Sequence, residues 1–174
     1  KTRYTLSGNA TAIDLEDRNN VGYIGCLDVV LFDKINQKYK IIDLKTSTHG
    51  WNKWQKADES KTHQLLLYKV FYAKEFNVPL DKIEVEFIIL KRKHDPDDPW
   101  GGDRIQRFVP PHGKMSSKEA WSSFNNFLNE SFTKSGEYNI DCSFPKTPGK
   151  NKKNCRYCEF AKKAGGPCDG KEGE

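Results

Sequence analysis

The chain has 174 residues, of which 36% are hydrophobic and 30% are charged, and its formal net charge is +5. This length suits one domain with a substantial core, and the composition differs from that of disordered or collagen-like chains. No apolar run approaches the roughly 20 residues of a membrane-spanning helix, so we expect no membrane association. The modest positive charge favours an anionic partner, although a lysine-rich surface accounts for it equally well.

Short apolar segments and polar turns alternate in the first half of the chain. Three strands are predicted, over residues 4–13, 21–32 and 39–46. The short separations between these strands indicate an antiparallel meander. After a loop with two tryptophans, apolar residues at helical spacing predict a long helix over residues 58–76. A fourth strand is predicted over residues 84–90, and the helical crossover before it favours parallel pairing.

The second half begins with a polar, proline-broken loop over residues 91–102. Residues 105–109 are predicted as a short edge strand. A second helix is predicted over residues 118–132, where Ser116 and Glu119 have the spacing of a capping box.

Three charged residues lie within two neighbouring predicted strands. Asp28 lies in the second strand, and Asp43 and Lys45 lie two residues apart in the third. Side chains alternate across a strand, so Asp43 and Lys45 project from the same face. Unpaired buried charge is costly, so a strand that buries charge usually forms a site. Two carboxylates and one ammonium on one sheet face suit metal-assisted hydrolysis. A surface ion pair between Asp43 and Lys45 is the alternative, but it leaves Asp28 unexplained.

The order of these motifs resembles that of the PD-(D/E)xK nuclease superfamily, specifically its RecB-like branch. Three segments carry the resemblance: residues 25–28 (GCLD), 41–46 (IIDLKT) and 64–68 (QLLLY). It covers roughly residues 4–92. It implies an α/β restriction-endonuclease-like core, in which helices flank a mixed sheet made of the antiparallel meander and the parallel strand. It also implies a metal-dependent DNA nuclease. Exonuclease action on DNA ends is the commoner role among similar proteins, in recombination, repair or processing.

The motif residues have defined roles in phosphodiester hydrolysis. Mg²⁺ and Mn²⁺ prefer oxygen ligands, which Asp28 and Asp43 can supply. The resemblance adds the backbone carbonyl of Leu44 as a further ligand. Lys45 can orient the attacking water and offset charge on the phosphate.

Two helix residues complete the expected site. Gln64 and Tyr68 lie one helical turn apart, and in similar nucleases these positions brace the lysine or contact the DNA backbone. An amphipathic helix would bury Tyr68 regardless of function. Many family members also carry a Glu or His on a helix before the first strand. This chain begins almost at that strand, so we expect no such helix within it. Either the ligand lies upstream of Lys1 or the site works with two carboxylates, and Asp14 and Glu16 are candidate substitutes.

Five cysteines form a second pattern. Cys155, Cys158 and Cys168 resemble the C-terminal part of the iron-sulfur staple of some RecB-like nucleases, and Cys142 is the candidate fourth ligand. Four thiolates suit a [4Fe-4S] cluster or, alternatively, a tetrahedral Zn²⁺. Unmetallated or disulfide-linked thiols are the third reading. Cys26 lies in a predicted apolar strand, where we expect it to be a small buried hydrophobe.

Basic and aromatic residues flank the expected site. Those expected to contact DNA are Lys53, Lys56, Lys61, Trp51 and Trp54. Lysines neutralise phosphates, and exposed aromatic rings stack on unpaired bases. A solvated face with ordinary core tryptophans is the alternative.

We therefore expect a nuclease core over residues 1–134 and a cysteine-containing tail over residues 135–174 that packs on the core. DNA is the expected partner. A homo-oligomer and a helicase or recombination partner are further candidates, because both occur among similar proteins. No secretory signal opens the chain, so we expect a cytoplasmic location in a bacterial or phage-infected cell. The alternative function is a weak or inactive nuclease-fold module that binds DNA or a partner protein without cutting.

Overall fold

The computed structural model describes residues 4–6, 11–14, 22–93, 97, 102–141, 146–148, 150–161, 165–166 and 168. The chain divides into two compact units, Lys1–Glu137 and Tyr138–Glu174, which are considered separately below. Within the described residues, no helix combines the length and apolar character needed to cross a membrane.

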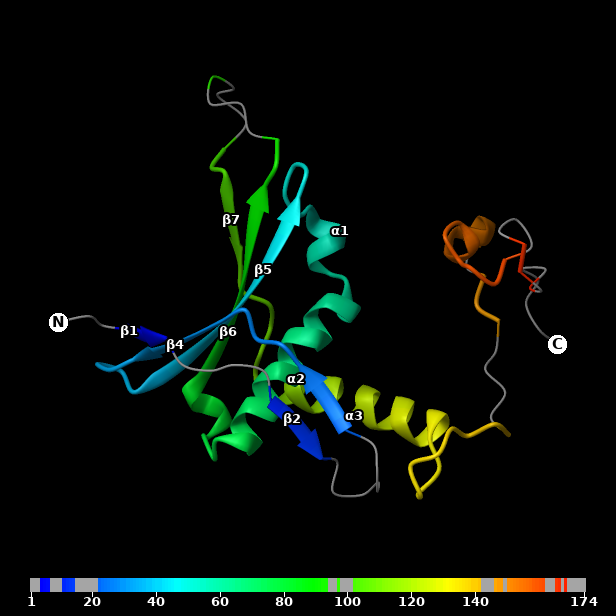
Figure 1. Cartoon of the computed structure of the whole chain (residues 1–174). Helices are drawn as coiled ribbons and strands as arrows, with labels where there is room; N and C mark the ends of the chain where they lie inside the picture. Colours follow the sequence, from blue (N-terminus) through cyan, green and yellow to red (C-terminus); the bar gives the residue numbers. More distant parts are fainter. Residues whose placement is uncertain are drawn as a thin grey trace. The chain divides into compact units, whose positions relative to one another are not determined.

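A five-stranded sheet with the strand order β1-β4-β5-β6-β7 forms the centre of the first unit (Figure 1). Its strands are β1 (Tyr4–Leu6), β4 (Val29–Asp33), β5 (Lys38–Ser47), β6 (Ile83–Lys91) and β7 (Ile105–Phe108). β5 pairs in parallel with β6, and the other neighbours in this sheet pair antiparallel. The predicted mixed sheet, with a parallel strand after a crossover helix, is therefore confirmed. A separate antiparallel pair is formed by β2 (Thr11–Asp14) and β3 (Gly22–Gly25).

The first two predicted strands are each divided, which corrects the sequence prediction. The segment expected as one strand over residues 21–32 forms β3 and β4, separated by residues 26–28. The last backbone pair of β4 with β5 joins Val29 to Ile42. Beyond it, the backbone N–H of Leu44 donates to the carboxylate of Asp28 at 2.7 Å. Asp28 thus contacts β5 through its side chain, at a bend just before β4 rather than inside a strand.

The described part of the first unit contains three α-helices. α1 (Lys53–Lys56) and α2 (Glu59–Glu75) lie between β5 and β6, α3 (Lys114–Ser131) follows β7, and a short 3-10 helix, η1 (Leu80–Lys82), precedes β6. Asp58 is the N-cap of α2, and its side chain accepts a hydrogen bond from the backbone N–H of Ser60. It packs on one face of the sheet, and α3 packs on α2 (Figure 1). The central core residues are Val30, Ile41, Trp51, Leu65, Tyr68, Tyr72, Ile83, Val85, Phe87 and Ile89.

α3 begins at Lys114, four residues before the predicted start, with Gly113 as its N-cap. The expected capping box is not used, because Ser116 lies inside the helix. The chain just before the N-cap instead contacts α2. Lys69 of α2 is buried and donates to the backbone carbonyl of His112 at 2.7 Å. Its burial lowers the pKa of the Lys69 ammonium.

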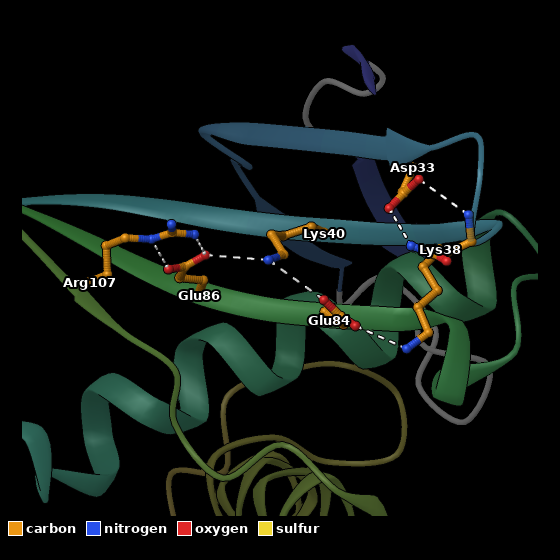
Figure 2. Close-up of polar contacts among 7 residues, drawn as sticks. Asp33, Lys38, Lys40, Glu84, Glu86 and Arg107 are labelled. Carbon is orange, nitrogen blue, oxygen red and sulfur yellow. Dashed lines mark hydrogen bonds and ion pairs between the residues drawn. The ribbon is translucent and has the colours of Figure 1, made fainter. Parts of the chain in front are cut away.

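Ion pairs connect three strands on the sheet face opposite the core (Figure 2). Glu86 of β6 is buried and accepts hydrogen bonds from Nε and Nη2 of Arg107 at 2.5 and 2.7 Å. Lys40 of β5 lies 3.6 Å from both Glu86 and Glu84, and Lys38 lies 3.0 Å from Glu84. The hydrogen bonds from Arg107 hold the pKa of Glu86 below its ordinary range. These pairs join β5, β6 and β7 behind the core face.

We expect Arg107→Ala to lower the free energy of unfolding by about 1–2 kcal/mol at pH 7. The substitution leaves the buried carboxylate of Glu86 with Lys40 as its remaining described partner. The folded-state pKa of Glu86 is depressed, so its contribution is present at neutral pH and is lost as the pH falls through the folded value. Urea unfolding of the wild type and Arg107→Ala at pH 7 and near pH 3 measures this. Arg104→Ala removes an exposed arginine and is the control; an equal Arg107→Ala effect at both pH values would contradict the prediction.

The second unit contains a short 3-10 segment, η2 (Lys150–Cys155). Asn151 and Lys152 within it have left-handed backbone conformations, with φ of 55° and 56°. Asn154 closes the preceding loop, because its backbone N–H donates to Pro148 and its side chain donates to Thr147. An isolated bridge pairs residue Ala161 with Cys168.

Candidate active site

Two carboxylates lie next to each other on the core face of the sheet. Asp43 of β5 is buried, with 5% of its surface exposed, and pairs in register with Phe87 of β6. Asp28 lies at the bend before β4, where its carboxylate accepts a hydrogen bond from the backbone N–H of Leu44, the residue after Asp43, and its charge acts on Asp43. Asp28 is exposed. The pair therefore consists of one buried and one solvent-facing carboxylate.

Lys45 connects Asp43 to helix α2. It lies two residues after Asp43 on the same strand, and its Nζ is 2.9 Å from Oδ2 of Asp43. The same Nζ donates a hydrogen bond to Oε1 of Gln64 at 3.3 Å. Nε2 of Gln64 in turn donates to the phenol oxygen of Tyr68 at 3.0 Å. Together with Asp28, these residues form one connected set that contains all five side chains predicted for the site.

Burial sets the electrostatics of this group. It raises the pKa of Asp43, and the charge of Asp28 adds to the rise, while Lys45 acts in the opposite direction. Burial likewise raises the pKa of the Tyr68 phenol. The fold thus buries the Asp43 carboxylate where its negative charge is unfavourable, and the ammonium of Lys45 offsets only part of this cost.

One carboxylate oxygen has an incomplete set of partners. Oδ2 of Asp43 is buried, and within the described part of the chain its partner is the ammonium of Lys45 at 2.9 Å. Buried carboxylate oxygens normally have hydrogen-bond partners or bind a cation. The donor set of two aspartates also matches the oxygen preference of Mg²⁺ and Mn²⁺. The residues therefore fit a divalent cation.

A third acidic ligand is not found among the described residues, where no three His, Cys, Asp or Glu side chains gather in a group that could hold a metal ion. The candidate substitutes named from the sequence, the Asp14 side chain and Glu16, lie outside what the structure describes.

Trp51, predicted to contact DNA, lies in the core instead. Its ring is 7% exposed and packs 5.0 Å from the ring of Phe87. Its backbone N–H donates to Oε1 of Gln106 at 2.6 Å, and Nε2 of Gln106 donates to its carbonyl at 3.1 Å. Sequence reasoning missed Gln106. The sequence feature that could have indicated Gln106 is its position two residues before Phe108, which places both side chains on the same face of β7.

Trp54 is the exposed tryptophan of this segment, with 73% of its surface accessible. It lies on α1, whose start is fixed by a capping box between Asn52 and Gln55. The ammonium of Lys53 lies 4.9 Å from the centre of the Trp54 ring. The other predicted lysines lie over core rings, Lys56 at 5.7 Å from Phe108 and Lys61 at 5.7 Å from Trp51.

Four described cysteines are thiols outside any disulfide, namely Cys26, Cys155, Cys158 and Cys168. Cys26 is exposed, so the prediction of a buried hydrophobe was wrong; the reason is the break between β3 and β4. Cys155 and Cys158 lie on one turn, in which the backbone N–H of Cys158 donates to the carbonyl of Cys155 at 3.4 Å. Cys142 lies outside the described residues.

For the nuclease activity that the motif resemblance implies, we expect Tyr68→Phe to lower the rate of DNA cleavage about 3- to 10-fold with little effect on stability. The phenyl ring still fills the core, but Gln64 loses its hydrogen-bond acceptor and holds Lys45 less firmly. Tyr72→Phe, one turn further along α2, is the control and should cleave at the wild-type rate. Steady-state cleavage rates measure both; equal losses in the two variants would show that the Tyr68 hydroxyl has no specific role.

Residues 6–162 match the PD-(D/E)XK nuclease superfamily. This match spans most of the chain and includes every residue of the site described above. The protein therefore belongs to the PD-(D/E)XK nuclease superfamily. Searches of curated proteins and of solved structures gave no significant match.

Proposed function

We propose that this protein is a divalent-cation-dependent DNA exonuclease of the RecB-like branch, acting in recombination, repair or processing. Membership of the superfamily indicates nuclease activity on nucleic acids. The observation that carries the proposal is the connection from the buried carboxylate of Asp43 through Lys45 to Gln64 on a second element. If Asp43 and Lys45 formed only a structural ion pair, a second carboxylate beside them would serve no purpose. Asp28 is such a second carboxylate.

In this proposal, Asp28 and Asp43 hold Mg²⁺ or Mn²⁺, and the backbone carbonyl of Leu44 is a further ligand. When bound, the cation supplies Lewis acidity for the phosphate and the attacking water. The N–H of Leu44 fixes the Asp28 carboxylate at 2.7 Å, so one aspartate is oriented by the strand that bears the other.

Lys45 positions the attacking water and offsets the negative charge that develops on the phosphate. Its ammonium has donors to spare, because it contacts one carboxylate oxygen and one amide oxygen. Gln64 keeps the lysine near the carboxylates, and Tyr68 keeps Gln64 in place.

The DNA backbone approaches along Lys53, Lys56 and Lys61 in this proposal. These lysines lie on α1 and the first turn of α2, the segment that joins the strand of Lys45 to the helix of Gln64. Each neutralised phosphate strengthens binding in a salt-dependent manner. The exposed ring of Trp54 is available to stack on a base at a DNA end.

The cysteines of the second unit are proposed to bind a [4Fe-4S] cluster or Zn²⁺ through Cys142, Cys155, Cys158 and Cys168. Support comes from the CxxC sequence on a turn and from the family resemblance. The described cysteines alone do not gather into a metal-binding group. Iron and zinc analysis of anaerobically purified protein tests the proposal, and protein with neither metal that is fully folded would contradict it.

Digestion of end-labelled DNA with Mg²⁺, Mn²⁺ or EDTA tests the nuclease proposal. We expect cleavage with either cation and none with EDTA, and we expect linear DNA to be degraded while covalently closed circles persist. Cleavage in EDTA would contradict cation dependence. Equal cleavage of linear and closed circular DNA would contradict exonuclease action but not nuclease action.

A non-cutting DNA-binding module is the second candidate. It is favoured by the absence of a third acidic ligand among the described residues. This candidate predicts that the protein binds DNA in EDTA but leaves it intact with every divalent cation.

A further inference from the structure

The second unit carries a surface that the proposed active site does not use. Two aromatic side chains on it are unusually exposed, Tyr157 at 85% and Phe160 at 68%. Large aromatic rings dominate core and interface energetics, so two exposed rings three residues apart suggest a surface for binding. Exposed basic side chains precede them in the sequence: Lys152, Lys153 and Arg156. We call these five residues the basic–aromatic patch.

Hydrogen bonds to the backbone hold this patch both within it and after it. Within it, Asn154 donates from its side chain to the carbonyl of Thr147 at 2.9 Å and from its backbone N–H to that of Pro148 at 3.0 Å. After it, the N–H of Cys168 donates to the carbonyl of Phe160 at 2.8 Å. The exposed rings therefore lie on a turn with its own hydrogen bonds.

The charge of this segment favours a polyanion. Residues 146–160 contain five basic residues and one acidic residue, Glu159. The guanidinium of Arg156 lies 5.3 Å from the centre of the Tyr157 ring, so positive charge and an aromatic face are presented side by side. Phosphates bind basic side chains, and bases stack on aromatic faces.

We propose that the basic–aromatic patch binds single-stranded DNA through residues other than those of the proposed active site. A duplex offers the patch its phosphates but keeps its bases stacked inside, where the two rings have no access. A single strand offers phosphates to Lys152, Lys153 and Arg156 and unpaired bases to Tyr157 and Phe160. This combination of charge and exposed rings distinguishes the patch from a merely solvated basic surface.

Fluorescence anisotropy of the full chain in EDTA tests the proposal, with a labelled oligothymidylate and a blunt duplex of equal length. We expect Tyr157→Ala/Phe160→Ala to weaken single-strand binding by at least about 5-fold, the smallest effect of losing one stacked base, and to leave duplex binding unchanged. Tyr157→Phe keeps the ring and should bind as the wild type does. Tyr138→Ala removes another exposed tyrosine of the same unit and is the matched control.

A second measurement addresses the charges and does not depend on the aromatic variants folding. The plot of log affinity against log salt has a negative slope. For the single strand, we expect this slope to become less steep by about 2 in Lys152→Ala/Lys153→Ala/Arg156→Ala. Unchanged single-strand affinity and slope in both variants would overturn the proposal. So would equal losses on single strand and duplex in the aromatic double variant, or a loss in Tyr138→Ala as large as in that variant. The assay requires no cleavage, so its outcome is independent of whether the protein is a nuclease.

Discussion

Replacement of Asp43 by asparagine is expected to lower DNA cleavage about 1,000-fold or more, because it removes the buried carboxylate that would bind the cation and a cation contributes several kcal/mol of transition-state stabilisation. Asparagine has nearly the same shape, so packing against the neighbouring strand is retained. The fold already disfavours the charged form of Asp43, since burial raises its pKa. We therefore expect the free energy of unfolding to change by less than about 1 kcal/mol.

Asp33→Asn is the matched control for this prediction. Asp33 is also a buried aspartate on a strand of the same sheet, but its carboxylate accepts hydrogen bonds from the turn residues Ile35 and Asn36. This variant should lose stability and keep its cleavage rate per folded molecule. Cleavage by Asp43→Asn at the wild-type rate would show that the carboxylates do not form the active site.

Lys45→Met should lower the cleavage rate by about 100- to 1,000-fold, in the range found when one preorganised electrostatic donor is removed. Methionine keeps the apolar stem and loses the ammonium that lies between Asp43 and Gln64. Because this charge acts on the phosphate during reaction, the loss should appear in kcat more than in KM. Single-turnover cleavage together with DNA affinity in EDTA separates the two effects.

Lys38→Met provides the control on the same strand. Lys38 lies on the opposite sheet face and pairs with Glu84 (Figure 2). Its removal should leave cleavage unchanged. The account of Lys45 fails if the two lysine variants cleave equally well, or if Lys45→Met weakens DNA binding without slowing the bound reaction.

The central strands and the long helix could be predicted from the sequence because their signals are local. β5 and β6 are apolar runs of strand length, and α2 has apolar residues at helical spacing. The site was predictable for a related reason. Asp43 and Lys45 interrupt an apolar strand at a spacing of two, so both had to project from the same face. The contact of Lys45 with Gln64 joins two motifs that the family resemblance had already paired.

The remaining features depend on partners far away in the sequence. The break before β4 involves the Leu44 amide, 16 residues after Asp28. Trp51 is buried because Phe87 and Gln106 lie against it, the latter 55 residues away. The early start of α3 accompanies a contact from Lys69. Local propensity contains no information on such contacts, so the exposure of Asp28 and the burial of Trp51 could not be predicted.

The central claim is that Asp28 and Asp43 form one divalent-cation site on the core face of the sheet. Titration of the protein with Mn²⁺, followed by the electron paramagnetic resonance signal of the unbound ion, measures this without requiring DNA or cleavage. We expect the wild type to bind Mn²⁺ and Asp28→Asn/Asp43→Asn to lose that binding while remaining folded by circular dichroism. Equal Mn²⁺ binding by the wild type and the folded double variant, or no binding by the wild type, would contradict the claim.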